Sequence, residues 1–236
     1  MIKINKRALP DSVVIRRAED YRDGSAAYKI LTEDCHDKCY ICEDSVHTAP
    51  EVDHRISRQG NPALYYDWNN LFLSCRHCNL TKSNKYDDII YPAATDPEQY
   101  IELSLELDDE LRETVVVRKK DGGADVDATV RLLDAVYNGT RDEKQYACRQ
   151  LKNKISNNLL WFYLNLDEYK ARPTGEQKAV IEHMLSDWAL FTAFKRKIIQ
   201  GDPDMQGNLA GDLVGTHQDS HQDSHPVSHP DKEGPA

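Results

Sequence analysis

The sequence has no apolar run long enough to cross a membrane, and charged residues interrupt its first twenty positions. A membrane-spanning helix needs about 20 consecutive, mainly apolar residues, and a secretory signal needs an unbroken apolar centre. We therefore expect a cytoplasmic protein with no membrane partner. Cysteine is also sparse, with six in 236 residues, and four of the six stand in two Cys-x-x-Cys pairs. Such a pattern is typical of metal binding in a reducing compartment.

A surplus of positive charge is missing as well. The chain carries 30 Lys and Arg against 40 Asp and Glu, for a net charge of −10. Residues 201–236 hold seven of the acidic residues and one lysine, whereas residues 51–86 hold five basic and three acidic residues. Proteins that bind nucleic acid unaided usually carry a basic surplus. The sequence also lacks a separate DNA-reading module such as a helix-turn-helix, which argues against sequence-specific recognition.

The two cysteine pairs predict a zinc site. Four thiolates are the ligand set of a closed, tetrahedral structural zinc site. Cys35 and His36 precede the first pair and are alternative ligands, but the end of a helix is the simpler interpretation because the pairs already complete a tetrahedral set. The 32 residues between the pairs exceed the spacing of a simple zinc ribbon, so further structure must lie between them. The predicted zinc ligands are Cys39, Cys42, Cys75 and Cys78.

Residues of a different chemistry lie between and after the cysteine pairs. Asp53, His54 and Asn79 offer oxygen and imidazole donors, which suit an open site where a divalent ion meets a phosphate. His54 is the candidate general base, because an imidazole with a pKa near about 6.5 accepts a proton at neutral pH. Asp53 and Asn79 would hold one Mg²⁺ or Mn²⁺. The pattern predicts a metal-dependent nuclease that hydrolyses phosphodiester bonds.

The order of these residues, from about Cys39 to Lys85, resembles the HNH or ββα-metal endonuclease family in its zinc-stapled form. Asp-His at the end of a strand and Asn-Leu-Phe-Leu-Ser-Cys before the second pair follow the family's pattern. Asn79 stands where the family's last histidine is found, as in its HNN variants. The resemblance implies an α+β fold with a ββα-metal core. It also implies that Asn70 binds no metal but orients the loop bearing His54.

Basic residues near the motif are candidates for contacts to the phosphates of a DNA substrate, with RNA left open by the sequence. Their spacing does not decide which of them face a substrate groove. These residues are Arg55, Arg58, Arg76, Lys82 and Lys85.

A wider resemblance concerns the nuclease subunit of Septu-type and retron-associated anti-phage systems. Cys-Tyr-Ile-Cys-Glu at 39–43, Tyr-Asp-Trp-Asn-Asn-Leu at 66–71 and Thr-Val-Arg-Leu-Leu at 129–133 carry it. Those subunits work with an ABC-type ATPase that restrains or activates them, so the resemblance implies an ATPase-controlled antiviral defence effector. Two alternatives stay open. One is a catalytically inactive zinc adaptor that recruits a partner, and the other is a stand-alone restriction or homing-type nuclease.

The chain divides into four predicted segments. Residues 1–37 form an N-terminal segment with a helix, and residues 38–91 form the HNH core. A small β segment and a helical region follow at 92–200. Residues 201–236 are a predicted disordered, acidic tail, because their histidine, serine, proline and aspartate content cannot bury a core.

Patterning within these segments predicts individual elements. Residues 45–54 read as a two-stranded ribbon, and residues 79–85 as a short helix with Asn79 in its first turn. Residues 100–107 and 113–119 read as two strands, followed by a turn signal at Asp121-Gly122-Gly123. Apolar periodicity predicts one helix over 174–200.

Overall fold

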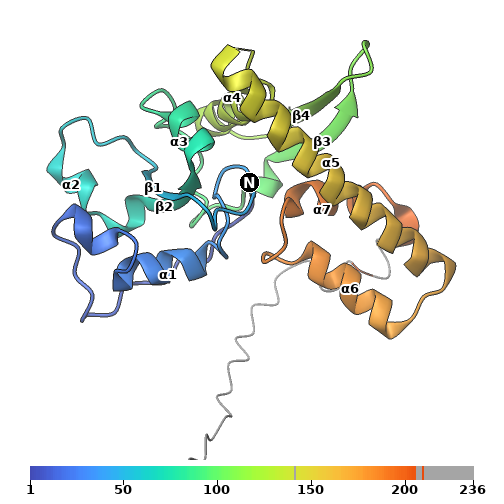
Figure 1. Ribbon diagram of the computed structural model, residues 1–236, viewed down its shortest axis with the longest axis horizontal. Coiled ribbons are helices and arrows are strands. Elements are labelled where there is room, and N and C mark those ends of the chain that lie inside the picture. The colour runs from blue at the N-terminus through green and yellow to red at the C-terminus, as the bar shows by residue number, and fades with distance from the viewer. Residues whose placement is uncertain (141, 206–208, 210–236) are drawn as a thin grey trace, which may run out of the picture.

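The computed structural model describes residues 1–140, 142–205 and 209, and it confirms the predicted α+β class (Figure 1). Short strands lie between helices in the N-terminal half, and helices dominate the C-terminal half. In chain order the elements are η1 (Ala18–Tyr21), α1 (Ala26–Asp34), β1 (Pro50–His54), α2 (Pro62–Tyr65), η2 (Trp68–Asn70), β2 (Leu71–Cys75), α3 (Arg76–Lys82), η3 (Pro97–Gln99), β3 (Ile101–Leu107), β4 (Glu113–Lys119), α4 (Ala124–Asn138), α5 (Asp142–Ala171), α6 (Gly175–Leu185) and α7 (Thr192–Gln200).

Strand β1 pairs with β2 in an antiparallel hairpin, with Pro50 opposite Cys75 and His54 opposite Leu71. The prediction of a two-stranded ribbon within 45–54 is therefore wrong, because the partner of β1 comes from beyond the intervening loop. Helix α3 follows β2 directly. It begins at Arg76, earlier than predicted, because the Cys75 side chain caps it by accepting a hydrogen bond from the backbone N–H of Cys78. The three elements together form a ββα unit.

The N-terminal segment contacts this unit at the start of β2. Lys6 donates to the carbonyl oxygens of Trp68 and Leu71, and its ammonium lies 4.1 Å from the centre of the Trp68 ring. The indole N–H of Trp68 in turn donates to the carbonyl of Arg7 at 2.8 Å. Burial lowers the pKa of Lys6 to about 8, but the ammonium form is held by these acceptors. The end of the loop between β1 and β2 is thus tied to residues at the start of the chain.

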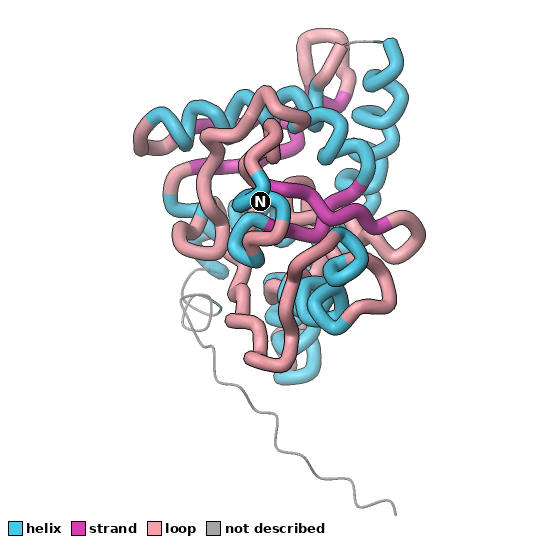
Figure 2. Tube along the Cα trace, turned by 90° about the vertical axis from the view of Figure 1, so that its left-hand side faces the viewer, coloured by secondary structure: helices cyan, strands magenta, loops and turns pink. Residues whose placement is uncertain are grey.

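Two apolar clusters hold the chain together. The larger joins the cysteine loops, β2, the β3–β4 hairpin, α4 and the first half of α5, with Phe72 and Tyr137 among its fully buried side chains. The smaller lies between the second half of α5, α6 and α7. Figure 2 shows helices surrounding the paired strands. Among the described residues, no helix combines the length and apolar character that a membrane crossing requires.

The C-terminal helices differ from the prediction of one helix over 174–200. Helix α6 ends at Leu185 and α7 begins at Thr192, after Phe191 in a left-handed conformation (φ 53°). The carbonyl oxygens of Asp187 and Ala189, between the helices, accept hydrogen bonds from the Lys38 ammonium. Contacts with a distant lysine therefore stabilise the break.

The segment predicted as a tail is described only in part. Met205 and Leu209 are buried in the smaller apolar cluster, on α5, α6 and α7. Packing against the helices therefore extends beyond residue 200. Residues 206–208 and 210–236, including His217, His221, His225 and His229, lie outside the described residues.

Candidate active site and metal centre

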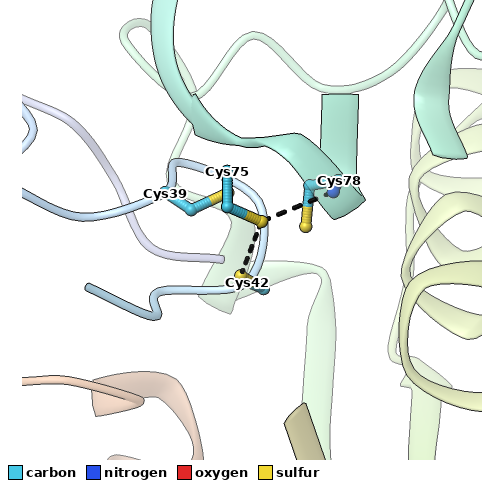
Figure 3. A group of neighbouring side chains, drawn as sticks. All are labelled: Cys39, Cys42, Cys75 and Cys78. Carbon is cyan, nitrogen blue, oxygen red and sulfur yellow. Dashed lines mark hydrogen bonds between the residues drawn. The ribbon is translucent and has the colours of Figure 1, made fainter. Parts of the chain in front are cut away.

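The four predicted zinc ligands converge from two parts of the chain (Figure 3). Cys39 and Cys42 lie in the loop after α1, while Cys75 ends β2 and Cys78 lies in α3. Their Sγ atoms all lie within 4.8 Å of one another, and those of Cys42 and Cys75 are 3.9 Å apart. Four thiolates around an ion with bonds of about 2.3 Å would be separated by about 3.8 Å. The cluster is therefore compatible with a zinc site.

Groups around the cluster support this use of the sulfur atoms. The backbone N–H of Cys78 points at Cys75 Sγ from 3.4 Å, and the Ser74 hydroxyl lies 3.7 Å from Cys39 Sγ. Cys35 instead caps the C-terminal end of α1, as the simpler interpretation of its position predicted. Within residues 1–140, 142–205 and 209, no other group of three or more His, Cys, Asp or Glu side chains converges in this way.

Asp53 lies on the face of β1 that packs against α3. Only 4% of the residue is exposed; its Oδ2 accepts from the Tyr40 hydroxyl at 2.6 Å and its Oδ1 from Lys82 Nζ at 3.3 Å. Burial raises the pKa of Asp53 to about 6, against the opposing effect of the Lys82 charge. Each carboxylate oxygen still has acceptor capacity to spare.

Lys82 is turned inward, with 1% of the residue exposed. Besides Asp53, its ammonium donates to the carbonyl oxygen of His54 at 2.8 Å. The predicted phosphate contact of Lys82 does not fit this placement, because the buried carboxylate and carbonyl already occupy the ammonium. The lysine instead links α3 to the end of β1 that carries Asp53 and His54.

Replacing Lys82 by methionine is expected to destabilise the fold by about 3 kcal/mol, because it leaves the Asp53 carboxylate buried and unpaired. Urea unfolding measures the loss, and Lys85→Met, which changes an exposed lysine just beyond α3, is the matched control. Without the Lys82 charge the pKa of Asp53 should rise above its present value of about 6, so the deficit should narrow as the pH falls from that higher pKa toward about 6 and the variant's carboxyl becomes neutral. A deficit that is the same at pH 5 and pH 8 would contradict this account.

His54, the last residue of β1, lies almost buried among aromatic rings. Its ring centre is 5.8 Å from that of Tyr21 and 6.2 Å from that of Tyr65. Its Nε2 lies 3.1 Å from the carbonyl oxygen of Tyr65, which only accepts, so Nε2 carries the hydrogen and a neutral ring keeps a lone pair on Nδ1. Burial lowers the pKa of His54, which favours that neutral form at neutral pH.

Asn70 closes the loop that follows His54. Its Oδ1 accepts from the backbone N–H of Ile56 at 2.8 Å, and its Nδ2 donates to the carbonyl oxygens of Ile56 at 2.9 Å and Leu64 at 3.1 Å. The side chain is buried, so these bonds are shielded from water. Asn70 therefore joins the two ends of the loop and limits the positions available to Tyr65, which holds the His54 ring.

Asn79 lies on α3, with its amide directed at β1. Its Nδ2 donates to Glu51 Oε2 at 2.8 Å, and Arg76 contacts the other Glu51 oxygen at 3.3 Å. Glu51 precedes Asp53 by two residues, which places both on the same face of β1. Glu51 is not among the residues predicted for the site, although this alternation along β1 is a signal that indicates it. Asn79 and Asp53 thus form hydrogen bonds with different partners at the interface between β1 and α3. The Oδ1 atom of Asn79 remains available as an acceptor.

The remaining basic candidates divide by exposure. Arg55 is turned toward the following segment, where its guanidinium donates to the Ile89 carbonyl at 3.1 Å and lies 5.2 Å from the centre of the Tyr91 ring. This placement differs from the predicted phosphate contact of Arg55, because the guanidinium binds a backbone carbonyl of the protein itself. The exposed basic candidates are Arg58, Arg76 and Lys85.

The geometry of a ββα unit with a four-cysteine cluster agrees with comparisons to known proteins. Residues 39–85 match the family model described as HNH endonuclease. The chain contains an HNH endonuclease domain. This confirms the predicted family for those residues, which include the cysteine cluster, His54, Asn70 and Asn79.

A curated relative gives a second comparison for this chain. Septu protein PtuB of Bacillus thuringiensis is 33% identical over 79 residues, which are 31% of this chain and 31% of that protein. The chain thus spans about a third of the length of the curated relative that it matches. The likeness agrees with the resemblance to Septu-type proteins found in the sequence.

Proposed function

We propose that this protein is a metal-dependent endonuclease that hydrolyses phosphodiester bonds in DNA. The observation that carries the proposal is the setting of His54, in a domain that matches the HNH endonucleases. Its Nε2–H is held by the Tyr65 carbonyl, 3.1 Å away, which leaves Nδ1 as a proton acceptor. A buried carboxylate, Asp53, is its neighbour in sequence.

His54 acts as the general base. Its Nδ1 takes a proton from the attacking water, and the Tyr65 carbonyl keeps the ring oriented while the charge on the imidazole changes. Asn70 holds the loop that carries Tyr65, and Lys82 holds the backbone of His54 through its carbonyl oxygen. These contacts keep the base in one position, which lowers the entropy cost of reaching the reactive geometry.

Asp53 and Asn79 are the residues that we expect to hold Mg²⁺ or Mn²⁺. Carboxylate and amide oxygens are the donors that these ions prefer, and both residues keep free acceptor positions at the β1–α3 interface. Such an ion, when bound, polarises the phosphate and stabilises the leaving oxygen. In the same proposal, Zn²⁺ on the four cysteines is structural, because the closed set of thiolates leaves no position for a substrate.

The biological setting that we propose is antiviral defence. The likeness to Septu protein PtuB supports an effector nuclease of an anti-phage system, under the control of an ABC-type ATPase. The net charge of −10 supports such a division of labour, because a nuclease with little basic surface gains from a partner that presents the substrate.

Cleavage of supercoiled plasmid by the purified protein tests the proposed activity. Reactions with Mg²⁺, with Mn²⁺ and without added divalent metal are compared, and zinc content is measured beside them. Nicked or linear product that requires the added metal supports the nuclease. Intact plasmid from folded, zinc-loaded protein, both alone and with the ATPase, would favour the inactive adaptor.

Changing Asn79 to histidine is expected to retain part of the activity and to shift its metal preference toward Ni²⁺ and Zn²⁺, because an imidazole nitrogen replaces an amide oxygen. Cleavage across a series of metals, with direct titration of metal binding, measures the shift. Asn84→His, which adds the same ring at an exposed position beyond α3, is the control. An unchanged preference would mean that Asn79 is not a ligand.

A further inference from the structure

A row of aromatic rings leads from His54 to the surface. The ring of Tyr65 lies beside His54, and the ring of Tyr66 follows with its centre 5.9 Å from that of Tyr65. Tyr66 is 38% exposed, and the Arg58 guanidinium lies over Tyr65 with its carbon 4.6 Å from the ring centre. We call Arg58, Tyr65 and Tyr66 the tyrosine–arginine rim.

The segment that carries the rim is basic in sequence. Residues 55–66 contain two arginines and no acidic residue. Two carboxylates lie next to it, because Asp87 accepts hydrogen bonds from Ser57 and Gln59 and Asp67 follows Tyr66. Arg55 is held inside by the Ile89 carbonyl, whereas Arg58 is exposed and makes no ion pair with any of the residues that the structure describes. In contrast, Arg76 on α3 is paired with Glu51. The loop therefore presents a cation and an aromatic face together, although the chain as a whole is acidic.

This combination selects one form of nucleic acid. The face of a base stacks on tyrosine or on a guanidinium only when no neighbouring base covers it, and phosphates are attracted to the same arginine. In a duplex the base faces are covered, so the exposed tyrosine has nothing to stack on. Packing in the hydrophobic core does not explain why a tyrosine stands at position 66, because more than a third of Tyr66 is exposed to solvent.

We propose that the tyrosine–arginine rim binds unpaired nucleotides beside the scissile phosphate. The proposal rests on the proposed nuclease function, since the row of rings begins at the candidate base. It narrows the substrate to nucleic acid that is single-stranded, or locally opened, where it meets the loop after β1. A base on Tyr66 would lie next to Tyr65, whose ring lies beside both His54 and Arg58.

Binding measured without cleavage tests the rim. The full chain carrying His54→Ala is titrated into fluorescently labelled single-stranded DNA and into a duplex of the same length, and anisotropy is recorded. We expect tighter binding to the single strand. We expect Tyr66→Ala to weaken that binding about ten-fold, which corresponds to the loss of about one stacked base. Tyr66→Phe keeps the ring and should retain most of the affinity.

A matched control separates the rim from aromatic surface in general. Tyr146→Ala removes a tyrosine that is 67% exposed on α5, and it should leave both affinities unchanged. Thermal unfolding and zinc content confirm that each variant is folded. No binding of the single strand, an unchanged affinity in Tyr66→Ala, or equal losses for single strand and duplex would overturn the proposal.

The two proposals fail separately. If the protein cleaves plasmid with added metal but Tyr66→Ala binds single-stranded DNA normally, the rim proposal is rejected and the nuclease proposal stands. If single-strand binding depends on Tyr66 but the protein cleaves no DNA, with or without an ATPase partner, the rim proposal is supported and the nuclease proposal is rejected.

Discussion

Replacing His54 by alanine is expected to lower the cleavage rate by about 10²–10⁴-fold, the usual contribution of a general base. The change removes the proton acceptor Nδ1 but touches none of the four cysteines, so zinc content should stay the same. The imidazole also donates one hydrogen bond to Tyr65, which is a small part of the contacts that hold the loop. The rate is measured under single-turnover conditions with Mg²⁺, and zinc by elemental analysis.

The matched control for this variant is His47→Ala. His47 lies in the same domain, between the first cysteine pair and β1, and its side chain is 67% exposed beside Asp37. Its loss should leave the rate unchanged. A His54→Ala protein that cleaves as fast as the original would show that another group takes the proton. A loss of zinc together with activity would show that the histidine is structural.

Replacing Cys75 by serine is expected to abolish stoichiometric zinc binding and to destabilise the domain by more than about 5 kcal/mol. Zinc on four thiolates contributes on the order of 10–16 kcal/mol of apparent binding energy in small zinc domains, and a serine hydroxyl is a poor substitute for a thiolate. In a chain of this size that loss corresponds to a fall in Tm of roughly 10–20 °C. Cys75 also caps α3, so the helix that carries Asn79 should fray with it.

Cys148→Ser is the control for the cysteine change. Cys148 is buried, whereas Cys75 is partly exposed. Cys148 lies on α5, where its Sγ donates to the Val136 carbonyl at 3.2 Å, a bond that a serine hydroxyl can also make. Zinc content and Tm should therefore change little. A Cys75→Ser protein that keeps its zinc and its stability would exclude the four-cysteine site, whatever its nuclease activity.

The chemistry of the candidate site was predictable because it depends on residue types at short spacings. Two Cys-x-x-Cys pairs select a soft metal whatever surrounds them, and an Asp-His pair at the end of a strand offers a carboxylate and a base. Some helices and strands were predictable for the same reason. Ser25 caps α1 through its hydroxyl, and strands β3 and β4 form at the residues predicted for them. These features depend on neighbours within a few residues.

The sequence by itself thus determined the family of residues 39–85 and the four cysteines that converge, and it predicts a separate site of oxygen and imidazole donors. Only the tertiary structure decided that β1 pairs with β2, that Lys82 and Arg55 turn inward, and that Glu51 meets Asn79. Each of these depends on groups far apart in the chain. The charged end of a long side chain can find acceptors in water or inside the protein. It turns inward when a partner such as Asp53 is buried nearby, and the spacing of residues in the sequence does not reveal that burial.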